Sequence, residues 1–327
     1  MIISMPDNWR AARPRHTQYL QERITAFVNN DRPKAKNWYS RTFVADVEKA
    51  ILSDSRAQME WSIHELLDCR QFMTDEVYAD LLSDLTRVFN YDTFSAKPRK
   101  PMPDHWDAYA LCASSQLATC PYCNYNYAHT LFRDGQGAMR PTLDHFYPKA
   151  LYPHLGLTLA NLIPSCYACN SSLKGEADFF LHKHLHPYFD QESVNFECSH
   201  PEHDFVSVLM AFDAIQGSLC VELQPRADCD LTRNSVSLFA LRQRYARFSK
   251  EGINFIAAQF AIEALLSNLN TASRWDPGEH LDLEQVTLRT RLLRFERSEY
   301  REYPLGKMYA DLFDQFHRGW EDLNETA

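Results

Sequence analysis

The sequence predicts a mainly α-helical protein with a small β-containing core in its middle. Apolar residues recur at three- and four-residue steps between residues 17 and 94 and again after residue 231, which is the spacing of amphipathic helices. Between these regions the pattern changes to short β-like runs separated by turn residues. The same middle segment contains two cysteine pairs, Cys120 with Cys123 and Cys166 with Cys169. We therefore expect three regions. These are an N-terminal helical region at 1–103, a cysteine-containing core at 104–204 and a mostly helical C-terminal region at 205–327.

The N-terminal region is expected to form a group of helices followed by a linker. Apolar residues keep helical spacing through the segments 17–30, 37–52 and 59–90. Residues 97–103 contain three prolines, which interrupt helices, and three basic side chains, so we expect a loop or linker at 91–103. A short helix is expected at 105–117.

The middle region is expected to contain a β-hairpin. Residues 124–146 place the turn residues RDGQG between two β-like runs, and the second run ends with Asp144 and His145. A second hairpin is expected at 205–223, around the Gln-Gly step at 216–217. Beyond it, helical spacing returns with a break at 272–280, in the segments 235–250, 252–269, 283–303 and 307–323.

The composition is that of a soluble globular chain. Of its 327 residues, 45% are hydrophobic and 24% are charged, and it has no run of about 18 apolar residues. The first residues place charge, Pro and Trp where a signal peptide would need an apolar stretch, so we expect a cytoplasmic location and no membrane partner. The nine cysteines have no disulfide-scaffold spacing. They are therefore expected to be reduced thiols or metal ligands.

Charge is distributed unevenly along the chain. The formal net charge of −9 argues against non-specific binding of polyanions by the surface as a whole. Residues 97–174 contain seven Lys or Arg and four Asp or Glu, a net of +3, so the remainder carries −12. This middle segment is either the place where nucleic acid is accepted or an ordinary solvated stretch.

The two C-x2-C pairs are the strongest motif in the sequence. Each pair offers two thiolates to one tetrahedral ion, and 42 residues separate the pairs. The alternatives are two chance pairs or a redox motif, and the absence of a βαβ pattern disfavours redox chemistry. Four thiolates leave no open position for substrate or water, so we expect one structural Zn²⁺ bound by Cys120, Cys123, Cys166 and Cys169. Catalysis must then come from other residues.

The residues between and after the cysteine pairs have the order of a known nuclease motif. The first C-x2-C pair is followed by LDHFYPK and then by NLIPSC-x2-CN-x3-K. This order resembles the HNH nucleases, which have the ββα-metal fold, in their zinc-ribbon-supported version. The resemblance covers residues 120 to about 175 and implies a metal-dependent endonuclease that hydrolyses DNA. The expected fold is thus mainly α with a small ββα-metal core stabilised by a four-cysteine zinc site.

The resemblance implies a role for each polar residue of the motif. Asp144 would be a ligand of a catalytic divalent ion, His145 the general base, and Asn161 the residue that orients the imidazole by hydrogen bonding. An imidazole has an unperturbed pKa of about 6.5, which suits the deprotonation of water at neutral pH. If Asp144 lies in a strand, its side chain points away from that of His145, so it can hold the ion while His145 faces the water.

Asn170 stands where the name-giving pattern has a second histidine. The chain therefore resembles the HNN subgroup, in which Asn supplies a carbonyl oxygen, and the expected catalytic ion is Mg²⁺ or Mn²⁺. Lys149 and Lys174 are candidates for phosphate binding, with a solvated surface charge as the alternative for each. Two further clusters are expected to be surface or supporting groups rather than a second metal site: His182, His184 and His186, and Cys198, His200 and His203.

A looser resemblance concerns the whole layout. Helical regions on both sides of a small core, together with YPLGKMYADLFDQF near the C-terminus, look like the PtuB-type HNH effector of the Septu and some retron anti-phage systems. That resemblance implies control by a partner of the ABC-type ATPase class. Two other functions stay open. One is a zinc-ribbon module that binds nucleic acid or protein through an inactive core, and the other is an HNH nuclease that acts on RNA.

Overall fold

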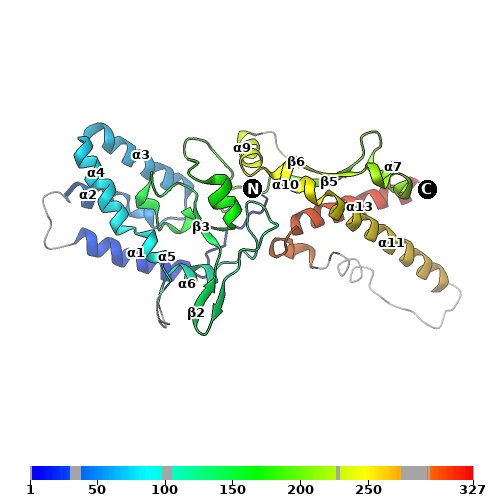
Figure 1. Cartoon of the computed structure of the whole chain (residues 1–327), viewed down its shortest axis with the longest axis horizontal. Helices are drawn as coiled ribbons and strands as arrows, with labels where there is room; N and C mark the ends of the chain where they lie inside the picture. The colour runs from blue at the N-terminus through cyan, green and yellow to red at the C-terminus, as the bar shows by residue number, and fades with distance from the viewer. Residues whose placement is uncertain are drawn as a thin grey trace. The chain divides into compact units, whose positions relative to one another are not determined.

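The computed structural model describes residues 2–29, 38–97, 105–225, 229–273, 293 and 295–326 (Figure 1). In this part of the chain helices predominate, and the strands form three separate two-stranded antiparallel sheets. The chain divides into two compact units. The N-terminal unit comprises Ser4–Tyr122 and Asn126–Gln191, and the C-terminal unit comprises Met1–Ile3, Cys123–Tyr125 and Glu192–Ala327. The N-terminal unit thus contains the predicted N-terminal helices together with most of the predicted core.

The helices of the N-terminal unit follow the apolar spacing of the sequence. They are α1 Arg13–Val28, α2 Trp38–Ile51, α3 Arg56–Phe72, α4 Asp75–Val88, α5 Tyr91–Ser95 and α6 Ala108–Ala113. Thr74 caps α4 by accepting a hydrogen bond from the N–H of Val77, so the predicted segment 59–90 forms two helices rather than one. Asn90 caps α5 in the same way, which places a short helix inside the predicted linker.

Two buried histidines, His16 and His154, join these helices to the segment 154–157. The Nε2 atom of His16 on α1 lies 2.7 Å from the carbonyl oxygen of Leu157, and its Nδ1 accepts a hydrogen bond from Trp106. The Nε2 atom of His154 lies 3.0 Å from the hydroxyl of Ser62 on α3. Burial lowers the pKa of His16 to about 4 and that of His154 to about 3. Both imidazoles are therefore neutral at physiological pH.

The strands of the N-terminal unit correct the predicted hairpin. They are β1 Leu131–Arg133, β2 Gln136–Met139, β3 Thr142–His145 and β4 Leu162–Ser165. The turn falls between β1 and β2 as predicted, at Asp134 and Gly135, which have positive φ angles. Pro141, which lacks a backbone N–H, separates β2 from β3, and β3 pairs with β4 instead. Asp144 and His145 therefore end a separate strand, and their placement on the hairpin was wrong.

Short helices connect and follow β3 and β4. They are η2 Pro153–Leu155, η3 Leu159–Asn161 and the π-helix η4 Ala168–Lys174. The π-helix ends at Gly175, whose φ of +52° lies in the left-handed region that favours glycine. β3 and η4 pack against each other, so the end of the strand and the end of the π-helix are neighbours.

The C-terminal unit combines one sheet with several helices. Its elements are β5 Val194–Ser199, α7 Phe205–Met210, α8 Phe212–Ile215, η5 Gln216–Ser218, β6 Cys220–Pro225, α9 Asp230–Leu238, α10 Leu241–Tyr245, η6 Ala246–Phe248, α11 Ser249–Ser273, η7 Arg297–Glu302 and α13 Gly306–Thr326. The prediction of a hairpin at 205–223 was wrong. Asp204 accepts a hydrogen bond from Ser207 N and so caps a helix there, and β6 pairs with β5. Helix α11 extends through residues 272 and 273 of the predicted break at 272–280, and residues 274–280 of the break and residues 283–292 and 294 of the segment 283–303 lie outside the described residues.

Helix α13 covers one edge of strand β5. Gln315 accepts a hydrogen bond from the N–H of Cys198 and donates one to its carbonyl oxygen, and Asp311 accepts one from the N–H of Phe196. These bonds satisfy backbone groups that an edge strand would otherwise expose. The apolar face of α13 is buried through Met308, Leu312 and Phe316. In the described part of the chain, no helix is both long and apolar enough to cross a membrane.

Candidate metal centre and candidate active site

Four cysteine side chains converge at one point. Cys120 and Cys123 lie in the loop closed by the isolated β-bridge between Thr119 and Tyr127, and Cys166 and Cys169 lie between the end of β4 and the first turn of η4. The four Sγ atoms all lie within 4.8 Å of one another. Tetrahedral Zn²⁺ with Zn–S bonds of about 2.3 Å needs S···S separations of about 3.8 Å, so small side-chain movements suffice. The predicted grouping is confirmed, and the cluster is positioned to hold a structural metal ion such as Zn²⁺.

The backbone around the cluster is shaped for closely spaced thiols. Asn124, directly after Cys123, has a φ of 51°, a left-handed conformation that Asn adopts more readily than most residues. The N–H of Cys120 donates to the carbonyl oxygen of Asn126 at 2.8 Å and closes the turn. The side-chain amide of Asn126 donates to the Sγ of Cys166 at 3.4 Å. A hydrogen bond to sulfur favours the thiolate form that a metal ion requires.

The two other clusters weighed in the sequence do not form such a centre. Among the described residues, no second group of three or more His, Cys, Asp or Glu side chains is placed to hold a metal ion. His184 is stacked on Phe179 with ring centroids 4.0 Å apart, His186 is fully buried, and His182 is exposed. These three histidines therefore have different surroundings and do not share one strand face.

Asp144, the penultimate residue of β3, is engaged on both carboxylate oxygens. The hydroxyl of Tyr122 donates to Oδ2 at 2.6 Å, and the ammonium of Lys174 donates to Oδ1 at 2.8 Å. Lys174 also donates to the carbonyl oxygen of His145 at 2.6 Å. The side chains of Asp144 and Lys174 are each 2% exposed. In this arrangement each carboxylate oxygen already accepts a hydrogen bond and a buried ammonium occupies the cation position, so the site as it stands does not fit the expected catalytic Mg²⁺ or Mn²⁺.

The two candidate phosphate-binding lysines have different surroundings. Lys174 is turned inward by the last turn of η4 toward Asp144, contrary to the expectation that it contacts phosphate or solvent. Lys149 is partly exposed, pairs with Asp92 at 2.7 Å and lies over the ring of Tyr91. An exposed ion pair of this kind contributes about 0–1 kcal/mol, so phosphate can compete with it. A phosphate contact by Lys149 stays a prediction.

His145 is held in one tautomer. Its Nε2 lies 2.9 Å from the carbonyl oxygen of Gly156, which can only accept a hydrogen bond, so Nε2 carries the proton and Nδ1 carries the lone pair. The ring meets that of Tyr91 edge to face, with centroids 4.5 Å apart. Burial lowers the pKa of His145 to about 4, against the opposing effect of the Gly156 hydrogen bond. The imidazole is therefore neutral at physiological pH.

Asn161 holds the chain after β3 rather than the imidazole itself. Its Oδ1 accepts a hydrogen bond from the N–H of Tyr147, and its Nδ2 donates to the carbonyl oxygens of Tyr147 and Leu155. These are buried backbone groups that need partners. The ring of His145 does not bond to Asn161 as expected and instead donates a hydrogen bond to the carbonyl oxygen of Gly156. Asn161 thus supports the imidazole indirectly, by fixing the loop that ends at Gly156.

Asn170 lies in η4 between the second cysteine pair and Lys174. Its N–H donates to the carbonyl oxygen of Cys166, and its own carbonyl oxygen accepts from Gly175 N, so its backbone is part of the π-helix. Its role as an ion ligand stays a prediction. Sequence reasoning missed Tyr122, Gly156 and Tyr91 as neighbours of the motif. Only Tyr122 had a signal, since it stands inside the first C-x2-C pair.

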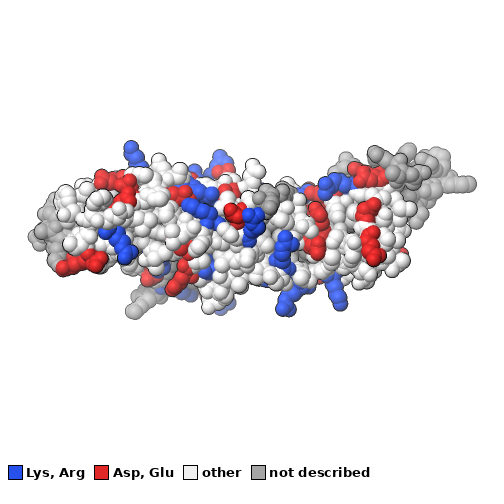
Figure 2. Space-filling view, turned by 90° about the horizontal axis from the view of Figure 1, so that it is seen from above, with Lys and Arg blue, Asp and Glu red and all other residues white. Residues whose placement is uncertain are grey.

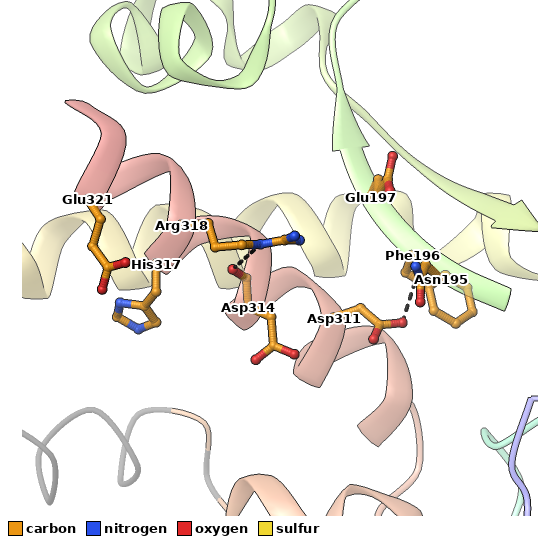
Figure 3. Close-up of a pocket in the computed structure, with 8 residues that line it drawn as sticks. All are labelled: Asn195, Phe196, Glu197, Asp311, Asp314, His317, Arg318 and Glu321. Carbon is orange, nitrogen blue, oxygen red and sulfur yellow. Dashed lines mark hydrogen bonds between the residues drawn. The ribbon is translucent and has the colours of Figure 1, made fainter. Parts of the chain in front are cut away.

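A surface pocket lies between β5 and α13 in the C-terminal unit (Figure 3). Its lining includes acidic side chains that already have partners. Asp311 pairs with Lys307 and accepts from Phe196 N, and Asp314 pairs with Arg297. These carboxylates serve packing and the helix–strand contact, so we assign no chemistry to this pocket.

Basic and acidic side chains are interspersed on the face drawn in Figure 2. Several described basic residues are paired with carboxylates: Arg13 with Asp54, Arg56 with Asp190, Lys149 with Asp92, and Lys183 with Glu60. Such pairing weakens the net field around the surface. This agrees with the charge balance, which argues against polyanion binding by the surface as a whole.

Together these features define a mainly helical protein with small two-stranded sheets and a four-cysteine metal-binding cluster. No family model matches the chain, and no solved structure matches it. Over 104 residues the chain is 29% identical to protein ea31 of Escherichia phage lambda, which covers 31% of this chain and 30% of that protein. The chain thus spans less than a third of the length of this curated relative.

Proposed function

We propose that the chain is an HNH-type endonuclease that hydrolyses phosphodiester bonds in DNA, with His145 as its general base. The observation that carries the proposal is the fixed tautomer of His145. The hydrogen bond from Nε2 to the carbonyl oxygen of Gly156 leaves the Nδ1 lone pair to accept a proton. Burial lowers the pKa of His145 to about 4, so the imidazole is unprotonated throughout the physiological pH range but is a weaker base than a free imidazole.

The proposed step transfers one proton and breaks one P–O bond. His145 Nδ1 takes a proton from water, the resulting oxygen nucleophile attacks phosphorus, and the bond to the 3′ oxygen breaks. The leaving 3′ oxygen takes up a proton from solvent and the imidazolium of His145 releases its proton to solvent, which gives a 5′-phosphate, a 3′-hydroxyl and the neutral base again. The proposal includes Mg²⁺ or Mn²⁺ bound by Asp144 and Asn170. The step above is written without this ion, because both oxygens of Asp144 already accept hydrogen bonds.

We extend the proposal to control by a partner. The net charge of −12 outside residues 97–174 should keep duplex DNA away from the isolated chain. An effector of anti-phage defence, governed by an ABC-type ATPase with or without a retron, would fit this need for a separate signal. The isolated chain should then bind duplex DNA weakly. Nanomolar binding by the isolated chain at physiological salt would contradict control of this kind.

A binding module is the second candidate function. It is favoured by the buried pair of Asp144 and Lys174, which neutralise each other. A zinc-ribbon module of this kind would bind nucleic acid or protein through an inactive core. Folded, zinc-loaded protein would then leave both DNA and RNA uncut in Mg²⁺ and in Mn²⁺.

Nicking of supercoiled plasmid tests the nuclease proposal. Wild-type protein is compared with His145→Ala and with His145→Gln, which retains more side-chain volume. Removing the proton acceptor should lower the cleavage rate by about 10²-fold or more while DNA binding is retained. His182→Ala, which changes an exposed histidine of the same unit, is the matched control and should cut like wild type. Full activity in His145→Ala would show that the base, and with it the nuclease assignment, is wrong.

A further inference from the structure

The buried contact between Asp144 and Lys174 has the features of a cation site that the chain fills by itself. The ammonium lies 2.8 Å from Oδ1 of Asp144 and 2.6 Å from the carbonyl oxygen of His145. It also lies 4.8 Å from the ring centroid of Phe179. A carboxylate, a carbonyl oxygen and an aromatic face are the groups that bind cations in proteins.

The second oxygen of Asp144 is also committed. Tyr122, a fully buried residue, donates its hydroxyl to Oδ2 at 2.6 Å. This hydroxyl is a donor to the carboxylate, so it and the ammonium of Lys174 contact the two oxygens of Asp144 from different sides. A metal ion at Asp144 would have to enter beside this hydroxyl and take the place of the ammonium of Lys174.

The ammonium and a divalent ion compete for the same carboxylate. Both are positive, and at the separation of two ligands of one oxygen their repulsion inside a buried site is strong. Lys174 is the last residue of η4, and Gly175, which follows it, adopts a left-handed conformation with open space around it. The backbone at this point therefore has the freedom to turn Lys174 outward.

We infer that Lys174 is the resident cation of Asp144 and blocks the loading of a divalent ion at this carboxylate until Lys174 withdraws. The inference rests on the proposed function, in which Asp144 is an ion ligand, and adds a built-in restraint on it. Lys174 is thus a positioning and blocking residue rather than a phosphate contact. A nuclease restrained in this way would need an event at the end of η4 before it could bind its ion.

Counting bound Mn²⁺ by electron paramagnetic resonance tests this inference without nucleic acid. Three proteins are compared: wild type, Lys174→Met, and the double variant Lys174→Met/Asp144→Asn. The double variant has no charge at this buried position, so it keeps the balance that folding requires. We expect wild type and the double variant to bind the same number of Mn²⁺ ions. Lys174→Met should bind one more ion, with at least tenfold higher affinity than any site at Asp144 in wild type.

Two results would overturn the inference. The first is one more Mn²⁺ ion on wild type than on the double variant, which would place an ion at Asp144 with Lys174 present. The second is a folded Lys174→Met protein that binds no more Mn²⁺ than the double variant, which would make the contact purely structural. If Lys174→Met fails to fold, Lys174→Gln, which removes the charge but keeps a polar side chain beside Asp144, replaces it in the same comparison. The Mn²⁺ counts do not depend on cleavage. A wild-type protein that cleaves no nucleic acid would therefore reject the nuclease proposal, and the Mn²⁺ counts would still test the inference about Lys174.

Discussion

Replacing one cysteine of the cluster is the most direct test of the metal centre. Cys169 is fully buried, and its Sγ lies within 4.8 Å of three other cysteine sulfurs. Structural four-ligand zinc sites bind with roughly 10–16 kcal/mol, so an equal share for one ligand is roughly 2.5–4 kcal/mol. Cys169→Ser should therefore weaken zinc affinity by roughly two to three orders of magnitude.

The same change should appear in the thermal stability, because zinc binding at such a site is linked to folding. For a unit of this size, each 1 kcal/mol shifts Tm by roughly 2–4 °C, so a fall of roughly 5–16 °C is expected. Zinc content after competition with a chelator and thermal melting measure the two effects on the same sample. Cys69→Ser, at a half-buried thiol of α3 outside the cluster, is the control and should keep both zinc and Tm.

Either of two results would refute this reasoning. A Cys169→Ser protein that loses zinc yet melts like wild type would show that the ion does not support the fold. A Cys169→Ser protein that keeps one zinc ion per chain against the chelator would show that Cys169 is not a ligand. Only in the second case would the convergence of the four sulfurs have another cause.

Three further predictions concern stability. Since the folded pKa values of His16 and His154, about 4 and about 3, lie below 6.5, the unfolded chain binds protons first. The free energy of unfolding should therefore decrease as pH falls from 6.5 toward the pKa values of the folded state. The two histidines together lower it by up to about 2.7 kcal/mol per pH unit. Equal urea midpoints at pH 7.5 and 5.5 would contradict this. Lys174→Met alone should cost about 3–5 kcal/mol, and the additional change Asp144→Asn should restore much of it; additive effects in urea unfolding would argue against a coupled pair. Asn161→Ala removes the hydrogen bonds of three buried backbone groups and should lower the free energy of unfolding by about 3 kcal/mol or more, measured by thermal melting. A decrease of less than about 1 kcal/mol would contradict this prediction.

The sequence predicted the features that depend on local spacing. Helices α1 and α2 lie where the apolar period places them, and the Asp-Gly step forms the turn between β1 and β2. The paired spacing of the cysteines also sufficed to predict that Cys120 and Cys169 belong to one cluster, since C-x2-C pairs present two sulfurs each.

The remaining features depend on contacts between residues far apart in the chain. β3 takes β4 as its partner, about 20 residues on, because Pro141 ends the ladder of the nearer hairpin. The inward turn of Lys174 depends on Asp144, 30 residues earlier, and nothing in the pattern of charges near Lys174 indicates burial. Asn161 was expected to form a hydrogen bond with the imidazole of His145. It instead bonds to the backbone N–H and carbonyl oxygen of Tyr147, because buried backbone groups need hydrogen-bond partners.

The edge-to-face contact between Tyr91 and His145 gives the candidate site its own spectroscopic label. With ring centroids 4.5 Å apart and planes at 83°, protons on the edge of one ring lie in the ring current of the other. Their NMR signals should be displaced from those of exposed imidazoles such as His182, which makes them distinguishable among the thirteen histidines of the chain. Tyr91 begins α5, so any movement of that helix relative to β3 would change these chemical shifts. The state of the site can therefore be followed in the ligand-free protein, before any substrate has been identified.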